Sequence, residues 1–522
     1  MSNRNSDLPH RPAEKQAVHS RADEVSNLLK AVQDLIIPFI SAADEDATAK
    51  ETGHGLSTSG GGPRTALVEH HKPPKLAKLM NLELPETGMA QAGFLKQVEQ
   101  IFQYSVNTWD RGFMNKLYAS TDAPGLAAEL ILATLNTNVH VYEVSPALTL
   151  IEKHTAHALA KLFGLTGPHA GGISVQGGTM ANTTSIVIAR NTLYPDTKEH
   201  GNASQNRKLV LFTSAHGHYS IEKAAQMLGF GSSSVWSVPV DPKTGSMDPS
   251  ALSSSIDKAM REGYTPFYLN ATAGTTVLGS YDPITPLAKI CKEHKIWLHV
   301  DAAWGGPAIF SPTHKSKLRG SNLASSITID PHKMMGVPIT CSFLLGANMR
   351  QFHASNTIPA SYLFHSSGPT SGEEIYDLAD FTLQCGRKGD SLKLYLSWIY
   401  HGTSGLAAQI ETAFSTTAHL ASLVSEHSDL KLVSENPPPC CQVCFFYAKN
   451  GELKDEEENG RVTKEIVQGL VTRGFMIDYA SVDERGPFMR VVVSRGTGRE
   501  AVEGLVEAVS ELGDKSWKSS GK

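Results

Sequence analysis

The sequence predicts an α/β protein whose main sheet is mostly parallel, with a smaller α+β region toward its C-terminal end. From about residue 94 onward, short apolar runs alternate with longer segments in which apolar residues recur at helical spacing. Strands that alternate with helices form βαβ units, and these units build parallel sheets. The apolar runs cover residues 208–212, 267–269, 296–300, 327–329 and 342–345.

The N-terminal region, residues 1–93, is predicted to combine a flexible segment with helices that pack in a dimer. Residues up to about Ala22 look disordered, and the apolar residues from Val25 to Ile40 fall on one face of a helix. That face requires a partner surface, either in the same chain or in a second subunit.

The remaining chain divides into a large domain at 94–390 and a small C-terminal domain at 391–522. In the small domain, a helix-rich start is followed by the predicted elements: strands at 444–447 and 488–493 and a helix at 462–472. The acidic run 455–458 is expected in a solvated loop.

Composition and charge exclude several classes of protein. The chain has 522 residues, 40% of them hydrophobic and 19% charged, as in ordinary globular proteins. A net charge of −5 argues against nucleic acid or an anionic membrane as the main partner. No apolar run looks long enough to cross a bilayer, and the N-terminus lacks a signal-peptide core. Six unevenly placed cysteines, without zinc-finger spacing around 440–444, predict a reduced cytoplasmic protein without a metal.

The segment 327–338 places a lysine at a strand end, where open α/β sheets bind their ligands. Its β-branched residues predict a strand that stops at Asp330, so that His332 and Lys333 follow directly. The neighbours of Lys333 are apolar: Met334, Met335 and Val337. Most lysines are solvated surface cations, but apolar surroundings would favour the free amine. A free amine condenses with carbonyl compounds.

Polar residues of other kinds follow further predicted strands. Asp301 could cap a helix or, if buried, hold a cation. Gly178 and Thr179 precede a helical pattern, where free N–H groups suit a phosphate, although an ordinary glycine turn looks the same. His218 and Thr272 could contact a heteroaromatic ring or could belong to ordinary loops. Together with a reactive lysine, these groups are what pyridoxal 5′-phosphate (PLP) requires.

The motifs between residues 94 and 512 resemble those of the group II PLP-dependent decarboxylases, in the branch of glutamate, cysteine-sulfinate and aspartate decarboxylases. The segments that carry the resemblance are 136–138, 270–277, 297–306, 331–337, 384–387 and 488–490. The resemblance implies the type I PLP-dependent (aspartate aminotransferase-like) fold, with a seven-stranded, mostly parallel sheet in a PLP-binding domain at 94–390. It also implies a homodimer whose active sites lie at the subunit interface.

The resemblance assigns the cofactor contacts residue by residue. Lys333 matches the lysine that forms the Schiff base with PLP, Asp301 the partner of the pyridine nitrogen, and His218 the catalytic histidine that stacks on the ring. The other cofactor-binding positions are Ala303, His332, Thr272, Gly178, Thr179 and Met180. Met180 stands where relatives often have serine, so the phosphate contact there would come from backbone N–H alone. Asp330 stands where many relatives have asparagine, which is expected to shift a hydrogen bond without abolishing activity.

Two further residues match catalytic positions of the family. Tyr362 matches the tyrosine of a mobile catalytic loop, about 352–371, and would protonate the α-carbon. Arg490 matches the arginine that grips a substrate carboxylate. An apolar residue in place of Arg490 would have favoured an aromatic substrate, and phenylalanine in place of Tyr362 an amine-oxidising reaction. A non-catalytic dimeric binding protein, the remote alternative, would have lost the lysine or the loop tyrosine.

The substrate is expected to be a short acidic L-amino acid. In the family, the segment that matches 113–118 lines the distal end of the pocket. Lys116 replaces a glutamine of relatives and adds a positive charge, and the aromatic Tyr118 should shorten the pocket. These features favour L-aspartate, which gives β-alanine, or cysteine sulfinate, which gives hypotaurine. The alternative is L-glutamate decarboxylase, which gives GABA.

Overall fold

The computed structural model describes residues 20–57, 64–358 and 374–519. Its larger sheet has seven strands in the order β1-β7-β6-β5-β4-β2-β3. The strands are β1 (Gly171–Val175), β2 (Leu209–Ser214), β3 (Val235–Val238), β4 (Thr265–Thr272), β5 (Trp297–Asp301), β6 (Ser326–Ile329) and β7 (Ser342–Gly346). Strand β7 is antiparallel to β1 and β6, and the pairs formed among β2 to β6 are parallel. The predicted α/β fold with a seven-stranded, mostly parallel sheet is confirmed.

The five predicted strands correspond to β2, β4, β5, β6 and β7. Strand β1 was not predicted because it begins with Gly171 and Gly172, and glycine is rare in strands. Strand β3, only four residues long, was also missed. Alternate side chains of β2 enter opposite cores, since Leu209 and Leu211 pack on one face of the sheet and Val210 and Phe212 on the other.

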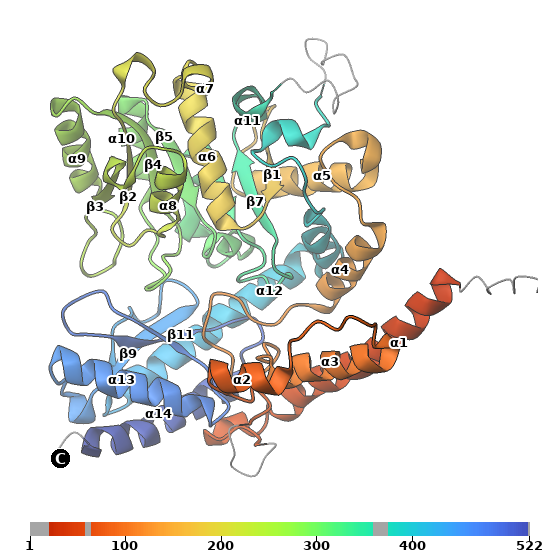
Figure 1. Cartoon of the computed structure of the whole chain (residues 1–522). Helices are drawn as coiled ribbons and strands as arrows, with labels where there is room; N and C mark the ends of the chain where they lie inside the picture. Colours follow the sequence, from red (N-terminus) through yellow and green to blue (C-terminus); the bar gives the residue numbers. More distant parts are fainter. Residues whose placement is uncertain (1–19, 58–63, 359–373, 520–522) are drawn as a thin grey trace, which may run out of the picture.

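Helices cover both faces of this sheet (Figure 1). One face packs against α6 (Gly178–Leu193), α8 (Ser220–Met227) and α11 (Met349–Asn356). The other packs against α5 (Pro146–Leu162), α9 (Pro249–Arg261), α10 (Ile284–His294) and α12 (Ser391–Glu426). Helix α4 (Ala123–Leu135) packs beside α5 and α12, and the short α7 (Thr197–His200) follows α6. The sheet is therefore buried on both sides, as parallel sheets are.

A second, antiparallel sheet follows in the order β10-β11-β9-β8. It consists of β8 (Leu430–Leu432), β9 (Gln442–Tyr447), β10 (Asp478–Ala480) and β11 (Phe488–Val492), covered by α13 (Glu456–Val471) and α14 (Arg499–Ser519). Helix α12 joins the two parts, because Leu406 and Ile410 belong to the first core and Leu420 and Val424 to the second.

The expectation that residues 455–458 form a solvated loop is wrong. Asp455 caps α13, and its side chain accepts a hydrogen bond from the N–H of Glu458 at 2.9 Å. The three glutamates that follow lie in the first turn of the helix. Negative charges there are stabilised by the helix dipole and by the unbonded N–H groups.

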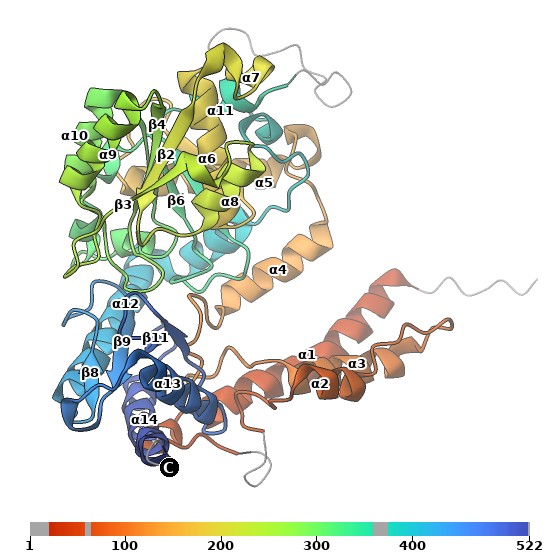
Figure 2. The same cartoon turned by 60° about the vertical axis from the view of Figure 1, so that its left-hand side comes forward.

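The N-terminal helices α1 (Arg21–Glu45), α2 (Pro73–Met80) and α3 (Ala90–Tyr104) form an arm that projects from the body (Figure 2). Phe39 of α1 packs against Phe102 of α3, with ring centroids 4.9 Å apart. Contrary to expectation, α1 is long and apolar enough, by length and composition alone, to cross a membrane. The sequence expectation missed this because the apolar residues of α1 are interrupted by Lys30 and Asp34.

A buried ion cluster fastens the base of this arm to the rest of the molecule. Lys50 is fully buried, with Nζ 2.6 Å from Oδ2 of Asp46 and 2.9 Å from Oδ1 of Asp110. The same Nζ donates to the carbonyl oxygen of Gly474 at 2.5 Å. Burial raises the pKa of Asp110 to about 7. We call these four residues the Lys50 clamp.

Candidate active site

A polar cavity of about 270 Å³ lies at the carboxyl ends of the parallel strands. The predicted residues that line it are Gly178, Thr179, His218, Thr272, Asp301, Ala303, His332 and Lys333. The topology brings them together because each follows, or ends, a strand of the same sheet edge. A larger cavity, of about 1160 Å³, opens between α5 and α11 and contains none of the predicted site residues.

Lys333 lies in the turn that follows β6. Its Nζ is 3.1 Å from Oδ2 of Asp330, a partner that the sequence interpretation did not include. The backbone N–H of Lys333 also donates to the carbonyl oxygen of Asp330 at 2.9 Å. The three apolar neighbours, Met334, Met335 and Val337, are buried in the main core. They anchor the turn and leave the lysine side chain 23% exposed at the cavity.

Asp301 ends β5 and is held by two hydrogen bonds. Its Oδ1 accepts from the N–H of Ala303 at 3.1 Å, and its Oδ2 accepts from Nδ2 of Asn182 at 2.9 Å. Oδ1 of Asn182 in turn lies 3.1 Å from Nε2 of His299. Burial lowers the pKa of His299 to about 4, so this imidazole is neutral at pH 7. A fixed carboxylate at this place suits a protonated pyridine nitrogen.

Asn182 and His299 are site residues that sequence reasoning missed. His299 lies two residues before Asp301 on the same strand, and this alternation could have marked it as facing the same side. Asn182 lies on α6, four residues after Gly178, one helical turn further along. Neither signal stands out without the structure, because a buried polar residue in a strand or helix has many possible partners.

Thr272, which pairs with Asp301 in the strand register, and His218 also line the cavity. The Thr272 hydroxyl is buried and has no hydrogen-bond partner among the described residues, which fits a bound polar ligand. The N–H of Thr272 donates to Oδ2 of Asp282 at 2.7 Å, and burial raises the pKa of Asp282 to about 6. Burial also lowers the pKa of His218, so its ring is neutral at pH 7. A neutral imidazole can stack on a cationic heteroaromatic ring.

The amino end of α6 faces the same cavity through Gly178 and Thr179. A Cβ at Gly178 would lie 2.8 Å from Oδ2 of Asp330, so only glycine fits there. The first N–H groups of a helix have no acceptor within the helix, and they bind phosphate well. Met180, by contrast, does not line the cavity: its N–H donates to the Gly177 carbonyl at 3.0 Å. The geometry therefore gives Met180 no phosphate contact, because α6 has already begun to satisfy its own N–H groups there.

The predicted substrate residues lie beside the cavity and do not line it. Arg490 on β11 donates through Nη1 to the carbonyl oxygen of Thr276, which does line the cavity, at 3.1 Å. Nη2 of Arg490 and Nζ of Lys116 both contact Oδ2 of Asp478, at 2.9 and 2.7 Å. Tyr118 packs on Phe113, with ring centroids 5.8 Å apart. Asp478 is a further residue that the sequence did not reveal.

Tyr362 lies outside the described residues, as does most of the predicted catalytic loop. The predicted start of that loop at residue 352 is wrong, since α11 continues to Asn356. Phe352 is fully buried against α6, and this packing holds the segment in the helix.

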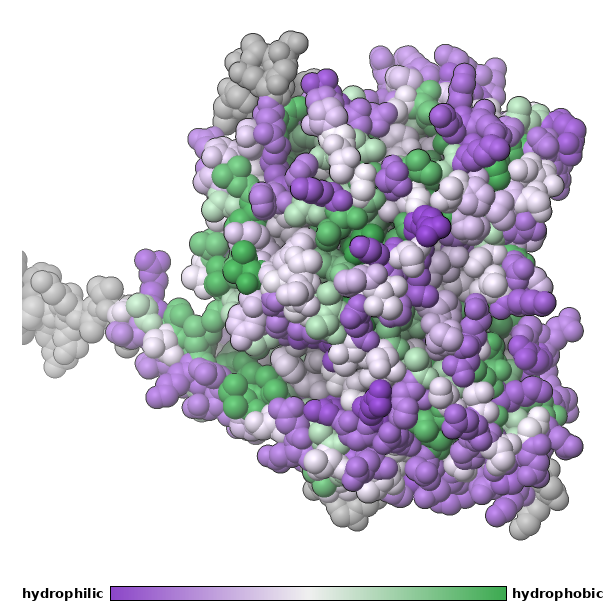
Figure 3. Space-filling view, turned by 180° about the vertical axis from the view of Figure 1, so that it is seen from behind, coloured by the Kyte–Doolittle hydropathy of each residue, from purple (hydrophilic) through white to green (hydrophobic). Residues whose placement is uncertain are grey.

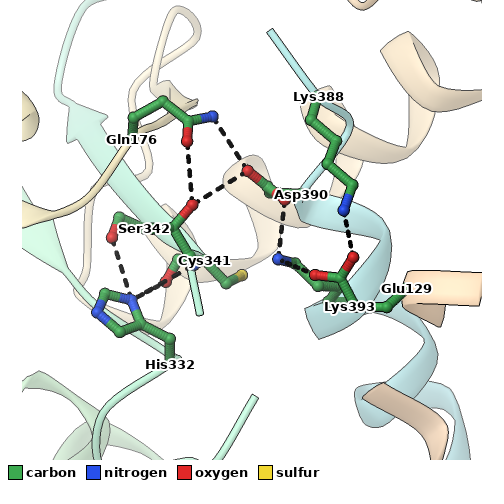
Figure 4. Close-up of polar contacts among 9 residues, drawn as sticks. Glu129, Gln176, His332, Cys341, Ser342, Lys388, Asp390 and Lys393 are labelled. Carbon is green, nitrogen blue, oxygen red and sulfur yellow. Dashed lines mark hydrogen bonds and ion pairs between the residues drawn. The ribbon is translucent and has the colours of Figure 1, made fainter. Parts of the chain in front are cut away.

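His332 lines the cavity and is tied to β7. Its Nδ1 lies 2.9 Å from the carbonyl oxygen of Cys341 and 3.3 Å from Oγ of Ser342 (Figure 4). Figure 4 also shows a second set of contacts on the far side of Cys341. There Asp390 accepts from Gln176 at 3.1 Å and pairs with the buried Lys393 at 2.8 Å. Through Asp390 and Lys393, the start of α12 thus holds the turn that follows β1 in place.

Two of the segments that carry the family resemblance, 136–138 and 384–387, stabilise the fold beside the cavity. Arg387 is fully buried in its ion pair with Glu152 of α5, at 3.1 Å, and donates to the carbonyl oxygen of Ser174 at 2.8 Å. Its N–H donates to Oδ1 of Asn138. Segments 136–138 and 384–387 therefore pack on one another beside β1 and support the strand that leads to Gly178.

A lysine, a carboxylate held by hydrogen bonds, a neutral histidine and the amino end of a helix surround one cavity, the set of groups that a PLP-dependent enzyme requires. The chain belongs to the pyridoxal-dependent decarboxylase family, whose conserved-domain model matches residues 73–448. The residues present fit the cofactor, since the Thr272 hydroxyl has no partner in the part of the chain that the structure describes and Gly178 leaves no room for a side chain at the start of α6.

Individual relatives align over nearly the whole chain. An L-aspartate decarboxylase of Metarhizium robertsii is 48% identical over 95% of this chain and 98% of its own. A glutamate decarboxylase-like protein of Gibberella zeae is 36% identical, with the same coverage. The crystal structure of mouse CSAD in apo form is 31% identical with a TM-score of 0.82, covering 94% of this chain and 99% of its own. Oryza sativa TDC with PLP and tryptamine, 21% identical with a TM-score of 0.84 over 95% and 99% of the two chains, shares the fold.

Proposed function

We propose that this enzyme removes the α-carboxyl group of a short acidic L-amino acid, with L-aspartate and cysteine sulfinate preferred over L-glutamate. The observation that carries the proposal is the 48% identity, over nearly the full length of both chains, to an L-aspartate decarboxylase. The cations Lys116 and Arg490 beside the cavity support an anionic substrate. L-glutamate is the second candidate because of the glutamate decarboxylase-like relative.

In this proposal the described residues divide the work of holding PLP. Lys333 would bond the aldehyde, Asp301 would hold the proton of the pyridine nitrogen, and His218 would contact the ring. The Thr272 hydroxyl, which has no partner among the described residues, would donate to a ring substituent, while Gly178 and Thr179 would offer N–H groups to the phosphate. When bound, PLP supplies an electron sink for the pair that the departing carboxyl group leaves behind.

The protein determines which bond breaks and where the next proton goes. Asn182, itself held by the neutral His299, fixes the Asp301 carboxylate in place. Arg490 orients a substrate carboxylate. Tyr362, by the family resemblance, delivers the proton to the α-carbon after carbon dioxide has left.

We also propose that the enzyme is a homodimer. Exposed apolar side chains gather on the side of the molecule from which the arm projects (Figure 3). They are Val25, Leu29 and Ile37 on α1, Phe94 and Ile101 on α3, and Leu126, Leu130, Ile131 and Leu135 on α4. Apolar surface of this extent is covered in stable proteins, and a two-fold partner is the commonest cover. Light scattering should give twice the chain mass of 56.3 kDa, and a monomer mass would contradict the proposal.

Turnover of the purified protein, loaded with PLP, tests the substrate. Carbon dioxide release is measured on L-aspartate, cysteine sulfinate and L-glutamate at equal concentrations. One methylene of side chain is worth roughly 1–3 kcal/mol in a fitted pocket, or about a 10- to 200-fold preference. A higher kcat/KM for either short acid is expected. A higher value for L-glutamate would overturn the preference, and no turnover of any of the three would overturn the function.

A further inference from the structure

The two cations beside the cavity share one carboxylate, that of Asp478. Asp478 begins β10 and stands directly opposite Arg490 of β11 in the strand pairing, so their side chains lie on the same face. Its Oδ2 accepts from Nη2 of Arg490 at 2.9 Å and from Nζ of Lys116 at 2.7 Å. Its Oδ1 accepts from the N–H of Tyr479 at 3.0 Å. Both carboxylate oxygens are therefore engaged.

Arg490 is buried, and its guanidinium donates to three acceptors. The side chain of Arg490 is only 7% exposed. Nη1 donates to the carbonyl oxygen of Thr276 and Nη2 also donates to that of Asn115, each at 3.1 Å. Nε is buried and has no partner among the described residues. Three of the five N–H groups of Arg490 are thus used, and Asp478 and two carbonyls fix the guanidinium plane, while Nε–H and one N–H of Nη1 have no acceptor among the described residues.

Arg490, Lys116 and Asp478 together carry one net positive charge. Two cations and one carboxylate leave a single net positive charge beside Thr276, at the edge of the cavity that contains Lys333. A substrate that is bound at Lys333 and carries one carboxylate on its side chain would balance that positive charge. A longer side chain brings its carboxylate closer to Asp478, and like charges at short range repel strongly in a partly buried site.

We propose that Asp478 determines substrate specificity by setting the length of acidic side chain that the site accepts; this inference rests on the proposed function. Asp478 holds Lys116, which is 53% exposed, and Arg490 at the distal end, and its own negative charge closes that end to a longer acid. Removing the charge frees Lys116 and leaves two uncompensated cations, which favours a carboxylate that reaches further.

The test compares wild type with Asp478→Asn, which keeps the size of the side chain and removes its charge. The first readout is the ratio of kcat/KM for L-aspartate to that for L-glutamate in the PLP-loaded enzyme. The second is the ratio of dissociation constants for succinate and glutarate, dicarboxylates that match the two acids without the amine and undergo no reaction. Both ratios are expected to shift at least fivefold toward the longer acid.

Asp483→Asn is the matched control, because Asp483 lies in the same β10–β11 hairpin and its ion-pair partner among the described residues is the nearby Arg485. It should leave both ratios unchanged. Asp478→Ser provides a second variant should Asp478→Asn fold poorly, and the same shift is expected. If Asp478 only stabilised the hairpin, activity on the two acids would fall together. A shift below fivefold in either ratio overturns the proposal, whereas an inactive wild type overturns the proposed function and leaves the dicarboxylate ratio to decide the role of Asp478.

Discussion

Nζ of Lys333 lies 3.1 Å from Oδ2 of Asp330, across the turn that ends β6. Asp330 is almost completely buried, whereas Lys333 reaches the cavity. The buried carboxylate therefore orients the lysine side chain.

The first prediction concerns Lys333. Lys333→Ala should lower carbon dioxide release on the order of 10³-fold or more, because among the described residues Lys333 is the one lysine that lines the cavity. Borohydride treatment of the PLP-loaded wild type should fix the cofactor to the chain, as seen by mass spectrometry. Lys431→Ala, an exposed lysine of β8, should behave as wild type in both assays. Cofactor fixed to Lys333→Ala at another lysine would refute the assignment.

Asp330→Asn is expected to be far milder. The amide keeps a hydrogen-bond acceptor beside Nζ of Lys333 but removes the buried charge, so kcat/KM should change by less than about tenfold. Borohydride should still fix the cofactor. A loss comparable to that of Lys333→Ala would mean that the ion pair itself is required for the reaction.

Thr272→Val should separate cofactor binding from stability. The hydroxyl has no partner among the described residues, so its removal should not destabilise the cofactor-free protein. PLP affinity should fall about 5- to 10-fold, the value of one hydrogen bond. Thr149→Val, another buried threonine whose hydroxyl lacks a described partner, lies on α5 outside the cavity and should leave PLP affinity unchanged. Equal PLP affinities for wild type and Thr272→Val would exclude the predicted contact.

The neutral state of His299 predicts a pH dependence of stability. Its pKa is lowered from 6.5 to about 4 by burial, so between these values the folded state binds fewer protons than the unfolded state. The free energy of unfolding therefore decreases as pH falls through this window, by about 2 kcal/mol between pH 7 and pH 5 for this residue alone. His299→Asn should lose this part of the dependence. Urea unfolding of both proteins at pH 7 and pH 5, at equal concentration, measures it, and identical differences for the two would contradict the assignment.

The Lys50 clamp should be one of the most sensitive points of the fold. Lys50→Met leaves Asp46 and Asp110 buried without their cation, which costs about 3–5 kcal/mol of stability. Lys449→Met is the matched control, because Lys449 also bridges two carboxylates, Asp429 and Asp514, but at the surface. Urea unfolding should show a much smaller loss for it, since water replaces the lost partner. Equal losses would show that burial of the clamp is irrelevant.

The sequence was sufficient for elements whose local pattern is strong. Strands such as β5 and β6 could be predicted because buried parallel strands are continuous apolar runs, and Asp301 and Lys333 could be placed at their ends. Asp478 could not be found, because its contact with Lys116 joins residues 362 positions apart. Such a pair depends on how β10 and the segment after Phe113 meet, and no periodicity records that. The acidic start of α13 was mistaken for a loop for a different reason: a run of acidic residues occurs both at the first turn of a helix and in solvated loops.

The Lys50 clamp also bears on how the protein is made. Its lysine is separated from the Gly474 carbonyl by 424 positions, so at 5–20 residues per second the ribosome needs roughly 20–85 s to deliver the last member. During that interval the clamp lacks the Gly474 carbonyl and is incomplete. The base of the arm must therefore attach to the Gly474 segment after most of the chain has been made. The contact between the base of the arm and residue 474 is thus among the last that this chain can form during its synthesis.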